Sequence, residues 1–95
     1  MPNKKQDDTF KHAYQLLCEY IEKHNLRHTN ERKLILSSVC ALQRFSVEEL
    51  RLSLTTLTIS RATVYNALTT MEKAGIIYRI EKDFGKRAGL YELAF

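Results

Sequence analysis

Apolar residues recur at intervals of three and four in the N-terminal part of the chain, which is the spacing of an amphipathic helix. Acidic and capping-type residues at positions 7–9 predict the start of this helix, after a flexible polar tail at residues 1–7. The helix should end near His24, because Asn25 tolerates the left-handed conformation that often closes a helix. Its expected apolar stripe consists of Phe10, Ala13, Leu17 and Ile21.

Two more helices are predicted by capping residues that precede apolar stripes. Thr29 is suited to cap the second helix. Ser46 and Glu49 have the spacing of a capping box, in which the hydroxyl and the carboxylate each accept a hydrogen bond from the other residue's backbone amide. The expected apolar faces are Leu34, Ile35, Val39 and Leu42 in the second helix, and Val47, Leu50 and Leu54 in the third.

The remainder of the chain reads as a fourth helix followed by a hairpin. Ser60 caps the helix, and Gly75 ends it. Residues 76–81 and 90–93 have the composition of strands, joined by a glycine-bounded turn that carries Lys86 and Arg87. Residues 58–59 could add one short strand rung. The predicted fold is mainly α with a small β-hairpin, a winged helix-turn-helix of four helices plus a wing, formed by residues 8–95.

The fourth helix has two chemically different faces when its residues are placed at helical spacing. Val64, Ala67, Leu68, Met71 and Ala74 form the apolar face, and Arg61, Ala62, Tyr65, Asn66 and Thr69 form the opposite one. A helix that reads DNA needs such a polar face, since its first residues reach base edges while hydroxyls and cations hold phosphates.

Each polar residue of this helix suits a particular contact with a duplex. Arg61 can pair with guanine, Asn66 with adenine, and the ring of Tyr65 can contact a thymine methyl group. Thr63, at the boundary of the two faces, suits a phosphate, as do Lys86 and Arg87 in the wing. We therefore interpret this surface as a DNA-reading site, although an exposed polar helix face and a basic turn are also common without any such role.

Composition limits the remaining choices. The 95 residues fit one small domain, and the net charge of +4 favours an anionic partner such as nucleic acid. No apolar run is long enough to span a membrane and no signal peptide is evident, so we expect a cytoplasmic protein. Cys18 and Cys40 do not form a metal-binding motif, and the pattern contains no catalytic set of residues.

The stretches NLRHTNERKLIL, FSVEEL, ISRATVYNALTTMEKAGII and GLYEL, in this order, resemble the N-terminal winged-helix domain of the ferric uptake regulator family, bacterial metal-responsive repressors. The resemblance covers roughly residues 25–93. It implies binding of double-stranded operator DNA by dimers, and repression of genes for metal uptake or oxidative defence. It also implies that Tyr65 lies in the recognition helix and that Arg27 reaches the minor groove. For Arg32 it implies either a contact with the DNA backbone or an intramolecular brace.

The chain departs from the family pattern in three respects. Asn66 stands where many members have an arginine after the tyrosine, and Arg44 stands where metal sensors often have a histidine ligand. The second domain of the family, which carries the metal ligands and the dimer interface, is not present in the 95 residues. We therefore expect no metal site in this chain, with zinc or iron bound only in such a second domain. We also expect a fragment of a longer regulator rather than a short family member, with pairing of two copies only on palindromic DNA.

Two other classes of function remain open. The same winged helix could bind a protein instead of DNA, with Tyr65 and Tyr78 as interface aromatics. An enzyme is the least favoured interpretation, because neither a nucleophile with its base nor a phosphate-binding glycine loop is evident.

Overall fold

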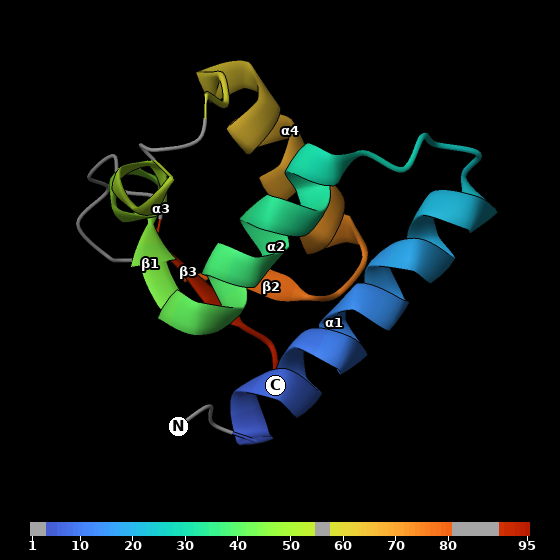
Figure 1. Cartoon of the computed structure of the whole chain (residues 1–95), viewed down its shortest axis with the longest axis horizontal. Coiled ribbons are helices and arrows are strands. Elements are labelled where there is room, and N and C mark those ends of the chain that lie inside the picture. The colour runs from blue at the N-terminus through green and yellow to red at the C-terminus, as the bar shows by residue number, and fades with distance from the viewer. Residues whose placement is uncertain (1–3, 55–57, 81–89) are drawn as a thin grey trace.

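The computed structural model describes residues 4–54, 58–80 and 90–95 of the chain. In this part, α2 lies at the centre of the molecule, with α1 along one side and α3 along the other (Figure 1). The elements are α1 (Lys4–Lys23), α2 (Asn30–Leu42), β1 (Arg44–Ser46), α3 (Val47–Ser53), α4 (Arg61–Lys73), β2 (Ile77–Ile80) and β3 (Leu90–Leu93). The four predicted helices and the two strands of the predicted hairpin are therefore confirmed.

The first helix starts earlier than the sequence indicated. It begins at Lys4, three residues before the capping-type positions, and it buries the stripe Ala13, Leu17 and Ile21. Its end agrees with the prediction, since Asn25 has a φ of 54° and the Leu26 amide donates to the Ile21 carbonyl at 2.8 Å. This left-handed closure turns the chain sharply into the loop that precedes α2.

The second helix is capped as predicted, with Thr29 Oγ1 accepting a hydrogen bond from the Arg32 amide at 3.2 Å. Its buried face differs from the prediction. Leu34 and Leu42 are 38% and 37% exposed, and their expected places in the core are taken by Leu36 and Cys40, beside Ile35 and Val39. The prediction was wrong for Leu34 and Leu42 because α1, α3 and α4 all pack against α2. Together they bury a different side of the helix from the one that the apolar spacing indicated.

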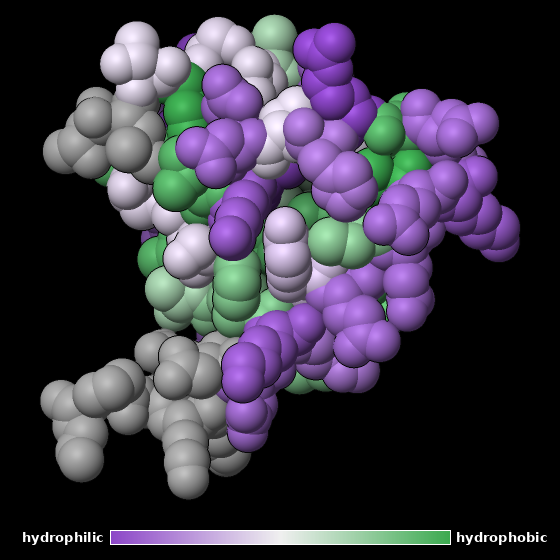
Figure 2. Space-filling model, turned by 45° about the vertical axis from the view of Figure 1, so that its right-hand side comes forward, coloured by the Kyte–Doolittle hydropathy of each residue, from purple (hydrophilic) through white to green (hydrophobic). Residues whose placement is uncertain are grey.

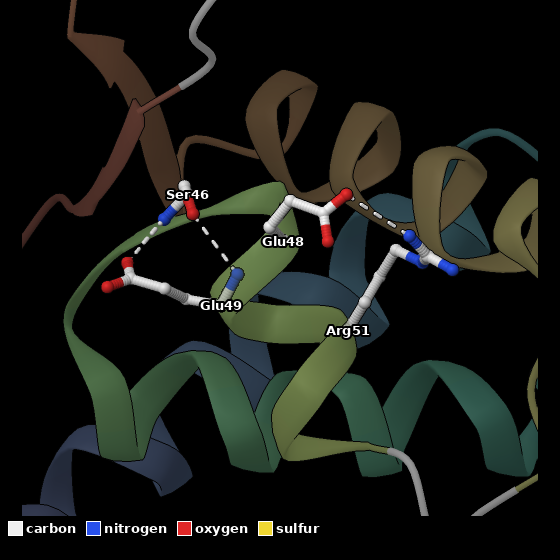
Figure 3. Close-up of polar contacts among 4 residues, drawn as sticks. All are labelled: Ser46, Glu48, Glu49 and Arg51. Atoms are coloured by element: carbon white, nitrogen blue, oxygen red, sulfur yellow. Dashed lines mark hydrogen bonds and ion pairs between the residues drawn. The ribbon is translucent and has the colours of Figure 1, made fainter.

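The third helix opens with the complete capping box that the sequence predicted (Figure 3). Ser46 Oγ accepts from the Glu49 amide at 3.1 Å, and Glu49 Oε1 accepts from the Ser46 amide at 2.8 Å. On the outer side of the same short helix, Arg51 and Glu48 form an exposed ion pair at 3.3 Å. The box matters because a helix of seven residues cannot stabilise itself and needs its ends satisfied.

Replacing Ser46 by alanine should lower the free energy of unfolding by about 1 kcal/mol, since it removes the acceptor for an amide at the helix start. Urea unfolding followed by circular dichroism would measure this loss. The matched control is Arg51→Gln, which removes the exposed ion pair of the same helix and should cost less than about 0.5 kcal/mol. Equal losses for the two variants would contradict the capping role.

The sheet has three antiparallel strands in the order β1-β3-β2. The strand β1 was not predicted from the sequence; Phe45 at its centre pairs with Tyr91 of β3. The prediction of a short strand at residues 58–59 is wrong, because those two residues belong to no strand. Three residues of strand carry too little pattern to be recognised, and here pairing with β3 decides their conformation.

One core holds these elements together. It includes Leu17 and Ile21 of α1, Ile35 and Val39 of α2, and Phe45 of β1, all 2% exposed or less. At the surface, hydrophilic side chains cover most of the α1 side of the molecule (Figure 2). Within the described residues, no helix is both long and apolar enough to cross a membrane.

Candidate nucleic-acid interface

The fourth helix presents the two faces that its sequence predicted. Val64, Ala67, Leu68 and Met71 are 1% exposed or less, so this side of the helix belongs to the core. The predicted polar face is open to solvent and consists of Arg61, Ala62, Tyr65, Asn66 and Thr69. Tyr65 is 47% exposed, which leaves much of a large ring available to a partner.

The N-terminal end of α4 is ordered by two hydroxyl groups. Ser60 Oγ accepts from the Thr63 amide at 3.2 Å and lies 2.9 Å from Thr63 Oγ1. Thr63 is half-buried at the boundary of the two faces, where we expected it. The amides of a first helical turn point out of the helix end and favour an anion, so this end suits a phosphate group. Ser60 was recognised in the sequence as a cap only, and the structure adds it to the site.

The other end of α4 sends the chain into the wing. Gly75 has a φ of 81°, and the Ile76 amide donates to the Met71 carbonyl at 2.9 Å. This confirms the predicted glycine stop and brings β2 back alongside the helix (Figure 1). Lys86 and Arg87, the expected phosphate contacts of the wing, lie outside the described residues.

Arg79 is a cation of the wing that sequence reasoning missed. It pairs with Tyr91 across the sheet, its Nη2 donates to the Tyr91 hydroxyl at 3.2 Å, and its guanidinium lies 5.6 Å from the centre of that ring. Strand alternation places Arg79 on the same sheet face as the buried Ile77, where a cation is not expected. The signal that could have found it is the buried tyrosine opposite, whose hydroxyl needs a partner.

The loop between α1 and α2 carries Arg27, with its side chain exposed. Arg32 lies in the first turn of α2, and its Nη1 donates a hydrogen bond to the backbone carbonyl of Arg27. The structure thus brings these two predicted residues together, and the bond between them is an intramolecular brace, one of the two roles expected for Arg32.

The outer face of the sheet carries a row of three polar residues that includes Arg44. Arg44 lies opposite Glu92, which in turn lies opposite Tyr78. The hydrogen bond to Glu92 raises the pKa of the Tyr78 hydroxyl, and the nearby positive charge of Arg44 opposes this shift. This row of three polar residues is held by contacts within the protein, on the opposite face of the sheet from the core.

The described residues do not bring together three side chains able to ligate a metal. Burial raises the pKa of the Cys40 thiol to about 11, so at neutral pH it is protonated and a poor nucleophile. The His24 ring lies tilted against the Tyr20 ring, with 4.2 Å between centroids, whereas His28 Nε2 lies 3.8 Å from Glu22 Oε2, so the two histidines have separate partners.

Comparison with known proteins identifies the group to which this architecture is similar. The model of the ferric uptake regulator family matches residues 23–94. Among solved structures, PerR from Streptococcus pyogenes, described for peroxide sensing and gene regulation, is 24% identical with a TM-score of 0.68 over 85% of this chain and 56% of that one. A zinc-containing structure, "GAS PerR-Zn-Zn", is also 24% identical, with a TM-score of 0.69 over 85% of this chain and 53% of that one.

A third solved structure extends this likeness to another member of the group. The ferric uptake regulator of Pseudomonas aeruginosa, solved with manganese, is 30% identical with a TM-score of 0.64 over 79% of this chain and 57% of that one. These structures confirm the predicted winged-helix fold, and the chain spans a little over half of their length. No curated protein matches the chain.

Proposed function

Because the chain belongs to the ferric uptake regulator family, whose members are transcription regulators rather than enzymes, we propose that it binds operator DNA sequence-specifically and represses the genes it controls. The observation that carries this proposal is the solvent-exposed face of α4, where Arg61, Tyr65 and Asn66 lie together at the capped end of a helix whose other side is buried.

The arrangement supports separate roles for the residues that read bases and the residues that bind phosphates. Arg61, Tyr65 and Asn66 read base edges in the major groove, while Thr63 and the amides at the start of α4 hold a phosphate. Lys86 and Arg87 in the wing hold further phosphates, and Arg27 enters the minor groove. With Asn66 in place of a second arginine beside Tyr65, adenine rather than guanine is the base expected at that position.

Metal sensing and dimer formation belong to a second domain of the family in this proposal. The described residues form no cluster of three metal ligands, and the part of the solved relatives that this chain matches is only 53–57% of their length. The chain alone then binds one half-site weakly. Two copies that are joined through the dimer interface of such a second domain bind a palindrome more tightly. The cytoplasm, where operator DNA is found, is the corresponding location.

The salt dependence of DNA binding tests this proposal. The probe is a duplex enriched by the chain from a randomised library, titrated between about 50 and 200 mM salt. If about four phosphates are neutralised, log Kd should change by about 3.6 per log unit of salt, so that affinity falls roughly a hundredfold over this range. Removal of either wing cation, by Lys86→Gln or Arg87→Gln, should lower that slope by about 0.9.

The control for the salt experiment is Lys11→Gln. Lys11 lies on the N-terminal half of α1, far from the capped end of α4 (Figure 1), and its loss should leave the slope unchanged. A winged helix that binds a protein instead, through the exposed Tyr65 and Tyr78, would enrich no duplex and would show no such slope.

A further inference from the structure

The contact between Arg32 and Arg27 joins the first turn of α2 to the residue that the proposed function places in the minor groove. Arg32 Nη1 donates to the Arg27 carbonyl, across five positions of the sequence. The Arg32 amide is itself fixed, because it donates to the capping Thr29 Oγ1 at 3.2 Å. Arg32 is only partly exposed, whereas the side chain of Arg27 is exposed. The guanidinium of Arg32 is thus directed at the backbone of the loop.

The loop that carries Arg27 is held on both sides of this contact. Before it, Asn25 adopts a φ of 54° and the Leu26 amide donates to the Ile21 carbonyl at 2.8 Å, which ties the loop to the end of α1. After it, the Thr29 cap ties the loop to the start of α2. The bond from Arg32 fixes the segment between these two anchors, so the direction in which Arg27 leaves the surface depends on it.

We propose that Arg32 is a positioning residue: it sets the backbone of Arg27 so that the Arg27 side chain is directed into the minor groove. This inference rests on the proposed function. Fixing one loop residue in advance removes an entropy cost that would otherwise arise on binding. A guanidinium suits the role because its planar fork can hold a carbonyl at a set angle, and because its charge strengthens the hydrogen bond.

A double-mutant cycle tests the coupling, with Kd measured for the wild type, Arg27→Ala, Arg32→Ala and the double variant on the duplex enriched by the wild-type chain. Arg32→Ala should weaken binding roughly three- to tenfold in the wild-type background, which corresponds to the net contribution of one hydrogen bond at an exposed position. In the Arg27→Ala background the same change should weaken binding less than about twofold, because the side chain that it positions is gone.

Base preference provides a second readout that a general loss of stability would not change. Replacing A·T pairs by G·C pairs in the minor-groove segment of the probe should weaken wild-type binding. Arg27→Ala and Arg32→Ala should each remove this preference while retaining the preference for the bases read by α4. Lys33→Ala, which removes a neighbouring cation of α2 that lies 5.3 Å from the Tyr14 ring, should leave both preferences intact.

The outcomes separate this inference from the proposed function. If Arg32→Ala weakens binding equally in both backgrounds, Arg32 is an independent phosphate contact and the inference is wrong, while DNA binding stands. If Arg27→Ala has no effect, the inference is also wrong. If no duplex is enriched and Arg61→Ala changes nothing, the proposed function itself fails. Should Arg32→Ala unfold, Arg32→Met, which keeps the length of the side chain but has no donor for the Arg27 carbonyl, enters the same cycle and must show the same coupling to Arg27.

Discussion

Replacing Phe45 by alanine should lower the free energy of unfolding by about 3–5 kcal/mol, the range for a buried aromatic ring. Phe45 is fully buried at the centre of β1, and its ring stacks on that of Tyr91 with 5.7 Å between centroids. A domain of this size has a total stability of about 5–14 kcal/mol, so this variant loses a large share of it. Thermal and urea unfolding would measure the change.

The control for this variant is the same chemical change at an exposed ring. Phe95 is 47% exposed and contacts His12 with 4.6 Å between ring centroids, so Phe95→Ala should cost less than about 1 kcal/mol. Phe45→Leu should fall between the two, because it retains much of the buried volume. A small loss for Phe45→Ala would mean that β1 and its pairing with β3 contribute little to the fold.

The parts of the fold that local chemistry decides could be predicted from the sequence. Thr29, Ser46 and Ser60 all cap helices, because each hydroxyl satisfies an amide within three residues of it. Asn25 and Gly75 both end helices in the left-handed conformation, which few other residues adopt without strain. None of these features depends on a distant part of the chain.

The parts that tertiary contacts decide could not be predicted in the same way. β1 exists because Phe45 pairs with Tyr91, which lies 46 positions further along the chain (91 − 45). Leu36 and Cys40 are buried in place of Leu34 and Leu42 because three helices surround α2. In both cases the local pattern admits more than one solution, and packing selects one of them.

The candidate site shows the same division. The exposed face of α4 follows from helical periodicity, so Arg61, Tyr65 and Asn66 could be grouped from their spacing in the chain alone. The bonds from Arg79 to Tyr91 and from Arg32 to Arg27 could not be derived, since each depends on how two elements meet. For Arg32, the family resemblance offered a brace or a backbone contact, and the loop geometry favours the brace.

Replacing both Arg61 and Tyr65 by alanine should weaken specific DNA binding by about 2 kcal/mol or more, since each side chain that reads a base contributes about 1–3 kcal/mol. The two residues lie one turn apart on the exposed face of α4, so both lose contact with the same few base pairs. Binding to unrelated duplex should change much less, because the phosphate contacts remain. Competition between the enriched duplex and a scrambled one would measure this ratio.

The control for the tyrosine is Tyr78→Ala, which removes an equally exposed ring from the outer face of the sheet, 48% exposed against 47% for Tyr65. If α4 reads the operator, Tyr65→Ala reduces specificity and Tyr78→Ala does not. Tyr65→Phe keeps the aromatic ring, so it retains the share of the specificity that comes from contact between the ring and a thymine methyl group. If both tyrosines instead form a protein interface, neither substitution changes the ratio between the two duplexes. Because the two rings are matched in type and exposure, any difference between the variants reports their positions on the fold.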